Sequence, residues 1–192
     1  MVTQEPPQHG ERRIEVEFDA NPVVLIGYHV PNAAHADAPA LRALSSILTG
    51  GRTARLVQRL VVRDRWAAQV SAGQAPGSRY PRLFMFSAAP IAPHTTQEIE
   101  GAIYEELERI QRDPPTDFEM QRIRNSAEYG SLSRLDNAFY LAIQLASSEA
   151  LWNDWTRPFR DDAALQAVSA ADVQRVARTY FSRANRTVAT LV

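Results

Sequence analysis

Residues 22–30 have the sequence PVVLIGYHV, a run that is almost entirely apolar. A short apolar run of this kind, rich in β-branched residues, predicts a strand in the middle of a sheet. The residues before it, 12–18, alternate apolar and charged side chains, and this alternation predicts a second strand with one face in water. Between them, residues 19–21 (Asp-Ala-Asn) predict a turn. The sheet is therefore expected to begin with these two strands.

The next part of the chain predicts two helices followed by two strands. Asp37 is a candidate N-cap for the first helix, and Gly50 and Gly51 are expected to end it. A long connection rich in proline and glycine separates the two strands, which is typical of a hairpin. The second helix is expected over residues 53–62, and the strands over residues 66–72 and 82–89.

The second half of the chain predicts mainly helices. Thr95 with Glu98 and Thr116 with Glu119 have the spacing of capping boxes, so each pair is expected to open a helix. The first of these helices should cover residues 95–112. The second opens a long helical region to about residue 155, bent near residues 130–136. Two short helices are expected over residues 161–168 and 173–181, the latter capped by Ser169, and a final strand over residues 186–192.

This order of elements predicts an α+β fold with a mainly antiparallel sheet, because strands and helices do not alternate as in a βαβ winding. The final strand must pair with strands that are distant in the sequence. Residues 11–192 are therefore expected to form a single cooperative domain. Residues 1–10 are polar and contain proline and glycine, and they predict a linker or disordered tail.

Composition excludes several classes of function. The chain has 192 residues, a net charge of -1 and no cysteine, so it offers no disulfide, thiolate zinc site or cysteine nucleophile. All 21 basic residues are arginine, which removes lysine chemistry. The balanced charge argues against nucleic-acid binding. No apolar run approaches the roughly 20 residues that a membrane helix needs, and the first residues do not have the pattern of a secretory signal.

Catalytic motifs are absent from the sequence. The four histidines, at positions 9, 29, 35 and 94, form neither His-x-x-Glu-His nor His-Glu-x-x-His, so no metal site and no catalytic residue are predicted. His29, at the end of an apolar strand, is interpreted as structural. The double glycine follows a helix and is not a phosphate loop. The acidic residues of the helix at 95–112 are expected to form a solvated face: Glu98, Glu100, Glu105, Glu106 and Glu108.

Three segments together resemble the second, non-catalytic domain of the insulinase/pitrilysin superfamily of zinc peptidases, which includes the mitochondrial processing peptidase subunits. Residues 28–73 contain Gly-Gly-Arg-Thr-Ala-Arg-Leu, similar to the family's turn after its first helix. Residues 131–155 are similar to its long helix before a Gly-Asp-Trp turn, with Asn153 in place of the glycine. Residues 169–192 are similar to its closing helix and its Asn-Arg-Thr-Val strand.

The resemblance implies a fold of the processing-peptidase or LuxS-like metallohydrolase type, in which helices back a curved antiparallel sheet. In this family two such halves form a clamshell. One half carries His-x-x-Glu-His and zinc, and the other closes over an extended peptide. Because this chain lacks the motif, the resemblance implies the second half, inactive alone and without its own cofactor. Its partner would be a catalytic half in the same polypeptide or a separate subunit, or the chain could form a homo-oligomer, in the periplasm or cytoplasm of a bacterium.

The resemblance also implies roles for four residues. An arginine and a tyrosine of the long helical region contact the substrate backbone in this family, and Arg134 and Tyr140 are the candidates here, since arginine can donate to a carbonyl and a tyrosine hydroxyl can stabilise an oxyanion. Arg122 and Tyr129 are the competing pair, and a surface arginine with a packed tyrosine is the structural alternative. For Arg52 and Arg55, contact with the partner half is weighed against local helix capping.

Two other functions are compatible with the same residues. One is an assembly subunit like the core proteins of respiratory complexes, which retain the fold and have lost the chemistry. The other is a free-standing module that binds extended peptides by adding a strand to a sheet edge.

Overall fold

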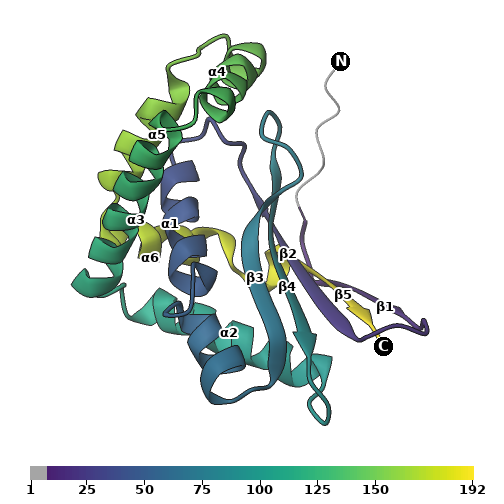
Figure 1. Cartoon of the computed structure of the whole chain (residues 1–192). Coiled ribbons are helices and arrows are strands. Elements are labelled where there is room, and N and C mark those ends of the chain that lie inside the picture. The colour runs from purple at the N-terminus through teal and green to yellow at the C-terminus, as the bar shows by residue number, and fades with distance from the viewer. Residues whose placement is uncertain (1–7) are drawn as a thin grey trace.

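The computed structural model describes residues 8–192, and the chain winds around one open sheet (Figure 1). Most of the predicted tail, residues 1–7, lies outside the described residues. The first described residue, Gln8, lies beside the start of the last strand, because its side-chain amide donates to the carbonyl of Arg186 at 2.7 Å.

The sheet has five strands in the order β1-β5-β2-β4-β3. Three of the four pairings are antiparallel and the β1–β5 pairing is parallel, so the α+β prediction with a mainly antiparallel sheet is confirmed. The apolar run quoted above forms β2, which pairs on both sides and is the central strand. The strands are β1 Arg12–Val16, β2 Val23–Val30, β3 Ala67–Ala75, β4 Arg82–Pro90 and β5 Arg186–Leu191.

The helices cover one face of this sheet and leave the other open (Figure 1). On the covered face the core includes a cluster of aromatic rings, in which Phe181 lies 4.9 Å from both Tyr28 and Phe84. Leu25, which points to the open face, is 37% exposed. The helical elements are α1 Ala38–Thr49, η1 Val57–Arg63, α2 Thr96–Arg112, α3 Asp117–Leu135, α4 Ala138–Trp152, α5 Arg157–Gln166, α6 Ala170–Tyr180 and the short η2 Arg183–Asn185.

Strand β1 differs from its prediction of one buried face, because all five of its residues are exposed. The strand lies at the edge of the sheet and pairs only with β5. Ile14 pairs with Ala189 in that register and stands on the open face, where it is 57% exposed. Arg13 faces the helices and donates to Glu100 of α2. The alternating residues of β1 therefore place apolar side chains on the open face of the sheet and a charged, ion-paired side chain on the face toward the helices.

Three capping boxes open helices as predicted, at Thr95, Thr116 and Ser169. Asp37 is the N-cap residue of α1, as predicted, but its side chain makes no capping hydrogen bond. The Asp37 carboxylate instead accepts hydrogen bonds from Arg175 and Tyr180 of α6, each at 2.6 Å. The carboxylate thus bonds to side chains of α6 rather than to the backbone N–H groups of the first turn of α1. These bonds hold the start of α1 against α6.

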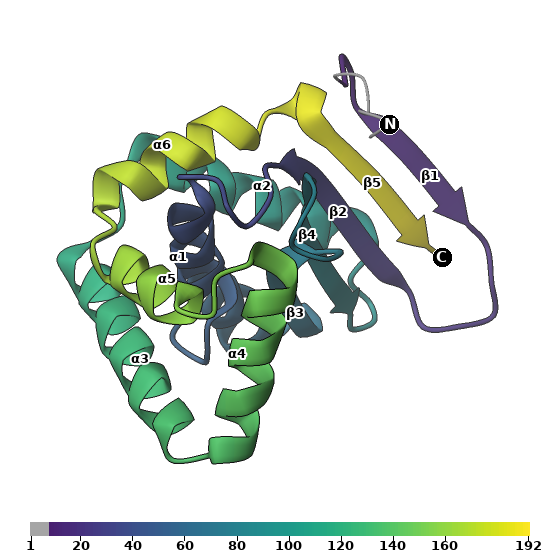
Figure 2. The same ribbon diagram turned by 90° about the horizontal axis from the view of Figure 1, so that it is seen from above.

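The sequence predicts one long helical region with a bend. The structure has two separate helices instead, α3 and α4, which meet at a sharp angle (Figure 2). Helix α3 ends at Leu135, and Asn137 opens α4 by accepting a hydrogen bond from the backbone N–H of Tyr140 at 3.2 Å. Asparagine is a favoured N-cap because its side-chain oxygen satisfies a free donor of the first turn. A new helix therefore starts where a bend is predicted.

The double glycine after α1 is required at both positions. A Cβ on Gly50 would lie 2.5 Å from the Ser46 carbonyl oxygen, and Gly51 has a φ of +89°. We expect Gly50→Ala to destabilise the chain by about 2 kcal/mol, because the backbone of α1 must shift. Gly101→Ala, in open space on α2, should instead stabilise by about 0.5–1 kcal/mol. Urea unfolding would measure both, and equal effects would contradict this explanation.

Candidate functional site

Helices α3 and α4 form a hairpin with an exposed apolar surface. Within α4, AFYLAIQLASSEALW, Glu149 is the one charged residue, and no side chain of this helix is buried. Phe139 is 69% exposed and Tyr140 is 65% exposed. We define the hairpin surface by the large exposed apolar side chains around the turn: Tyr129, Leu132, Leu135, Phe139, Tyr140 and Ile143.

The inward side of α4 carries polar as well as apolar side chains. Gln144 and Ser148 line a pocket of about 250 Å³ together with Trp152 of the same helix. Arg134 at the end of α3 and Asp162 of α5 line the same pocket. The other half-buried residues of α4, Leu141 and Leu145, are apolar, so this helix has large apolar side chains on both its inward and its outward side.

Arg134, the first arginine expected to contact substrate, is engaged within the chain. Its guanidinium donates to the carboxylate of Asp162, which is 7% exposed. A second arginine, Arg42, lies 3.9 Å from the same carboxylate. Tyr140 belongs to the hairpin surface, where its ring lies 5.8 Å from that of Phe139. Within residues 8–192 no direct contact joins Arg134 to Tyr140.

In the competing pair, too, the arginine is engaged within the chain and the tyrosine is exposed. Arg122 donates to the Thr53 hydroxyl at 2.5 Å and to the Ser46 carbonyl at 3.0 Å, so it holds α3 against the end of α1. Tyr129 is 74% exposed on the hairpin surface. In both pairs the arginine joins elements of this chain and the tyrosine is exposed. The structural alternative, in which the tyrosine is packed, therefore does not describe either tyrosine.

The two arginines of the Gly-Gly-Arg turn are placed differently from each other. Arg52 is exposed, and its carbonyl accepts a hydrogen bond from Gln58. Arg55 is partly buried and donates to both oxygens of Glu119 in α3, at 2.6 and 2.8 Å. It also lies 3.5 Å from Glu106 of α2. The Arg55 side chain thus joins the segment just before η1 to α2 and α3, and it does not cap η1.

The Glu119 carboxylate is strongly held in its charged form. Burial alone would raise the pKa of Glu119, but hydrogen bonds from Arg55 and Thr116 outweigh burial and lower the pKa to about 2. Because the pKa is lower in the folded state than its ordinary value of 4.5, Glu119 stabilises the fold above pH 4.5. That contribution is lost as the pH falls from 4.5 toward 2.

We expect Glu119→Gln to lower the free energy of unfolding at pH 7 by about 2 kcal/mol, after solvent screening of the partly exposed pair. The variant should also lose less stability than the wild type between pH 5 and pH 3. Urea unfolding at several pH values would measure both. Glu108→Gln, an exposed glutamate of α2, is the matched control. Parallel pH curves for wild type and Glu119→Gln would contradict the assignment.

The predicted solvated face of α2 is wrong for two of its five glutamates. Glu100 is 4% exposed and accepts hydrogen bonds from Arg13 and from the Tyr104 hydroxyl. Glu106 is 3% exposed and lies 3.5 Å from both Arg55 and Arg109. Arginines from β1 and from the segment just before η1 cover these carboxylates, and the spacing of residues along α2 does not predict this. The available signal in the sequence for the burial of Glu100 is Tyr104, which lies four residues later, on the same side of α2, and donates to it.

Within the described part of the chain, no group of three or more histidine, aspartate or glutamate side chains is arranged to hold a metal ion. Every helix in residues 8–192 is too short or too polar to span a bilayer.

The sequence profile of the peptidase M16 inactive domain matches residues 1–127, and the chain belongs to this family. It is the non-catalytic type of domain found in zinc protease-like proteins, as the sequence resemblance implied. The zinc protease PqqE of Helicobacter pylori is 27% identical to it over 186 residues. That alignment covers 93% of this chain but only 40% of PqqE.

Solved structures show the same fold. A protease from Helicobacter pylori superposes with a TM-score of 0.92 at 26% identity, covering 100% of this chain and 46% of that one. The peptidase M16 inactive domain from Pseudomonas fluorescens superposes with a TM-score of 0.82 at 13% identity, covering 98% of this chain and 45% of that one. This chain therefore spans less than half the length of each of these relatives.

Proposed function

We propose that this chain is the substrate-binding half of a clamshell zinc peptidase, which closes over an extended peptide held by a catalytic half. Membership of the inactive-domain family supports the non-catalytic role. The sequence has no His-x-x-Glu-His, and the described residues provide no set of metal ligands, so zinc would be bound by the catalytic half. The hairpin surface is the observation that carries the closing role.

The hairpin surface has a composition that favours contact with another molecule. Contiguous large apolar side chains are uncommon on the surface of a protein that acts alone. Burying a phenylalanine or leucine side chain contributes about 1.5–3 kcal/mol. Several such residues around one turn would therefore favour docking, and the nearly uncharged α4 would present no carboxylate or guanidinium that must lose water except Glu149.

The position of Arg134 suggests a supporting role in this proposal. Its ion pair with Asp162 joins the end of α3 to α5 just before the hairpin turn. The pair would hold α4 in place, and Tyr140 would present its hydroxyl to the peptide. Tyr140 is then the residue of the two that contacts the substrate, and Arg134 is a positioning residue.

The proposal is tested by cleavage of a mixed set of unstructured peptides in the presence of zinc. This chain alone, a half bearing His-x-x-Glu-His alone, and the two together would be compared. Activity is expected only in the mixture, or strongly raised there. If the two halves bind each other and the mixture remains inactive, the substrate-binding role is wrong and the assembly-subunit role replaces it.

A further inference from the structure

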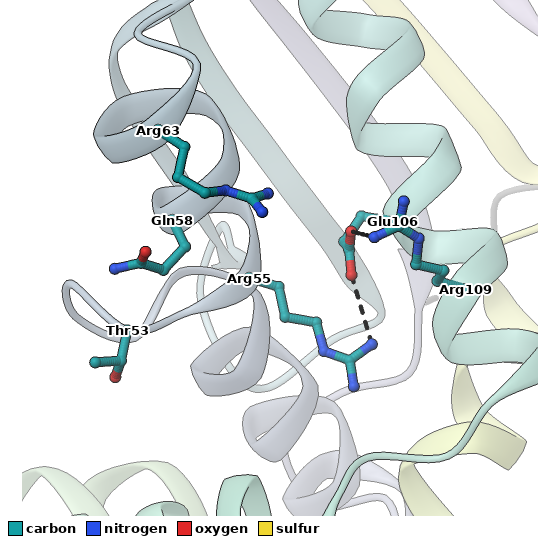
Figure 3. Close-up of a pocket in the computed structure, with 6 residues that line it drawn as sticks. All are labelled: Thr53, Arg55, Gln58, Arg63, Glu106 and Arg109. Carbon is teal, nitrogen blue, oxygen red and sulfur yellow. Dashed lines mark hydrogen bonds and ion pairs between the residues drawn. The ribbon is translucent and has the colours of Figure 1, made fainter.

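A pocket of about 430 Å³ lies between η1 and α2 (Figure 3). Its lining residue Arg55 donates to Glu119 in the first turn of α3, so the pocket lies near the end of α3 that is far from the hairpin. All six lining residues have polar or charged side chains, and three of them are arginines. The lining residues are Thr53, Arg55, Gln58, Arg63, Glu106 and Arg109. The three guanidinium groups come from separate turns of the chain, and they surround one space (Figure 3).

The charges of the pocket do not cancel. Three arginines against Glu106 leave the lining with a formal charge of about +2, in a chain whose net charge is -1. Arg55 is already engaged by a second carboxylate, that of Glu119. With Glu119 counted, three arginines face two carboxylates, and the formal excess is +1, with Arg63 as the arginine that has no carboxylate partner among residues 8–192.

Glu106 organises two of the three arginines. It is 3% exposed, and its two carboxylate oxygens lie 3.5 Å from Arg55 and from Arg109 respectively. One buried carboxylate thus places a guanidinium on each side of itself. Both contacts are at the long end of the hydrogen-bond range, so N–H donors on both arginines remain available for a further acceptor.

Arg63 supplies the third guanidinium. It stands in the last turn of η1 and, within residues 8–192, makes no ion pair or side-chain hydrogen bond. Its side chain extends from η1 toward α2 (Figure 3). The Thr53 hydroxyl accepts from Arg122 and can still donate its own proton. The pocket therefore contains unused donors from two helical elements and one loop.

We propose that this pocket binds an oxyanion group, a carboxylate or a phosphate. The planar fork of arginine pairs with two oxygens of such a group at once, and bidentate, charge-assisted hydrogen bonds of this type are the strong ones. A cation is repelled by the three arginines, and an apolar ligand would strip water from them without replacing their hydrogen bonds. The site is independent of the pairing proposed above, because the isolated chain contains all of it.

The test is calorimetric titration of the 192-residue chain with inorganic phosphate and with succinate at low ionic strength. A third titrant is an acidic peptide, compared with the same peptide carrying glutamine in place of glutamate. Arg63→Gln and Arg109→Gln should each weaken binding about tenfold, since each removes a charge-assisted contact. Arg79→Gln, the same charge change in the β3–β4 loop, should leave binding unchanged.

Arg63→Gln is the decisive variant, because Arg63 has no described partner to lose and the variant should fold normally. If the chain binds phosphate, and Arg63→Gln weakens this binding while Arg79→Gln does not, the pocket is a site for free anions. The same pattern with the acidic peptide, and not with its glutamine version, would identify a peptide side chain as the source of the carboxylate. Absence of binding by every titrant, or equal weakening in Arg79→Gln, would overturn the proposal.

Discussion

Replacing Phe139 and Ile143 together by serine is expected to weaken binding of the catalytic half about 100-fold, or about 3 kcal/mol, if the hairpin surface is the contact. Both side chains are exposed in the isolated chain, at 69% and 48%. Their loss therefore removes no packing from the core, and the unfolding transition should hardly change. Peptidase activity of the mixture should fall in parallel when the catalytic half is present below its dissociation constant.

Phe118→Ser is the matched control for this experiment. Phe118 is 76% exposed and stands in the first turn of α3, roughly 25 Å from the hairpin turn at 1.5 Å per residue. Phe118→Ser removes one exposed aromatic side chain from α3, at the end of that helix far from the hairpin turn. Equal loss of binding in Phe118→Ser and in the double variant would show that the effect is not specific to the hairpin. Unchanged binding in the double variant would sink the proposed docking face.

The second large effect is expected for Asp162→Ala, which should lower the free energy of unfolding by about 3 kcal/mol. Asp162 is 7% exposed and accepts from Arg134, with Arg42 on its other side. Its removal leaves two guanidinium groups without their shared carboxylate. Because Arg134 ends α3, the amides of α4 should also exchange hydrogen faster than in the wild type.

Asp161→Ala provides the control one residue away. The Asp161 side chain is 42% exposed and pairs with Arg157 at 3.3 Å within the same helix, so its loss should cost about 0.5 kcal/mol or less. Urea unfolding of both variants, with hydrogen exchange of α4, makes the comparison. If Asp162→Ala is as mild as Asp161→Ala, the ion pair does not hold the hairpin, and Arg134 would be free for another role.

Local signals in the sequence were sufficient to predict most elements. Each capping box needs only two side chains three residues apart, and the boxes at Thr95, Thr116 and Ser169 all open helices. The apolar run of β2 predicts its central place, because a strand paired on both sides and covered by helices has little access to water. These features depend on neighbours in the chain, and so a single sequence reveals them.

Features that depend on distant partners were missed. Nothing near Asp37 shows that its carboxylate will be taken by Arg175 and Tyr180 rather than by the start of α1. Glu100 and Glu106 have the spacing of a solvated face, but arginines from β1 and from the segment just before η1 cover them. Polar burial of this kind is decided by three-dimensional packing, which periodicity does not encode.

The candidate site shows the same limit. Sequence resemblance directed attention to the arginines of α3 and of the double-glycine turn, and the structure engages Arg134, Arg122 and Arg55 in contacts within the chain. The exposed surface of α4 was missed because an apolar helix normally predicts a buried one. Its inward polar side chains, Gln144 and Ser148, were the available signal.

The place of β5 between β1 and β2 determines the order in which the strands can pair while the domain is being synthesised. As the chain emerges from the ribosome, β2 can pair with β4 early, but its other edge has no partner until residues 186–191 have been made. Strand β1 waits for the same residues, because β5 is its one neighbour in the sheet. Within this sheet, the strand that comes first in the sequence therefore cannot pair before the strand that comes last. A nascent chain stalled before Arg186 would present the bare edge of β2 to chaperones or to other chains.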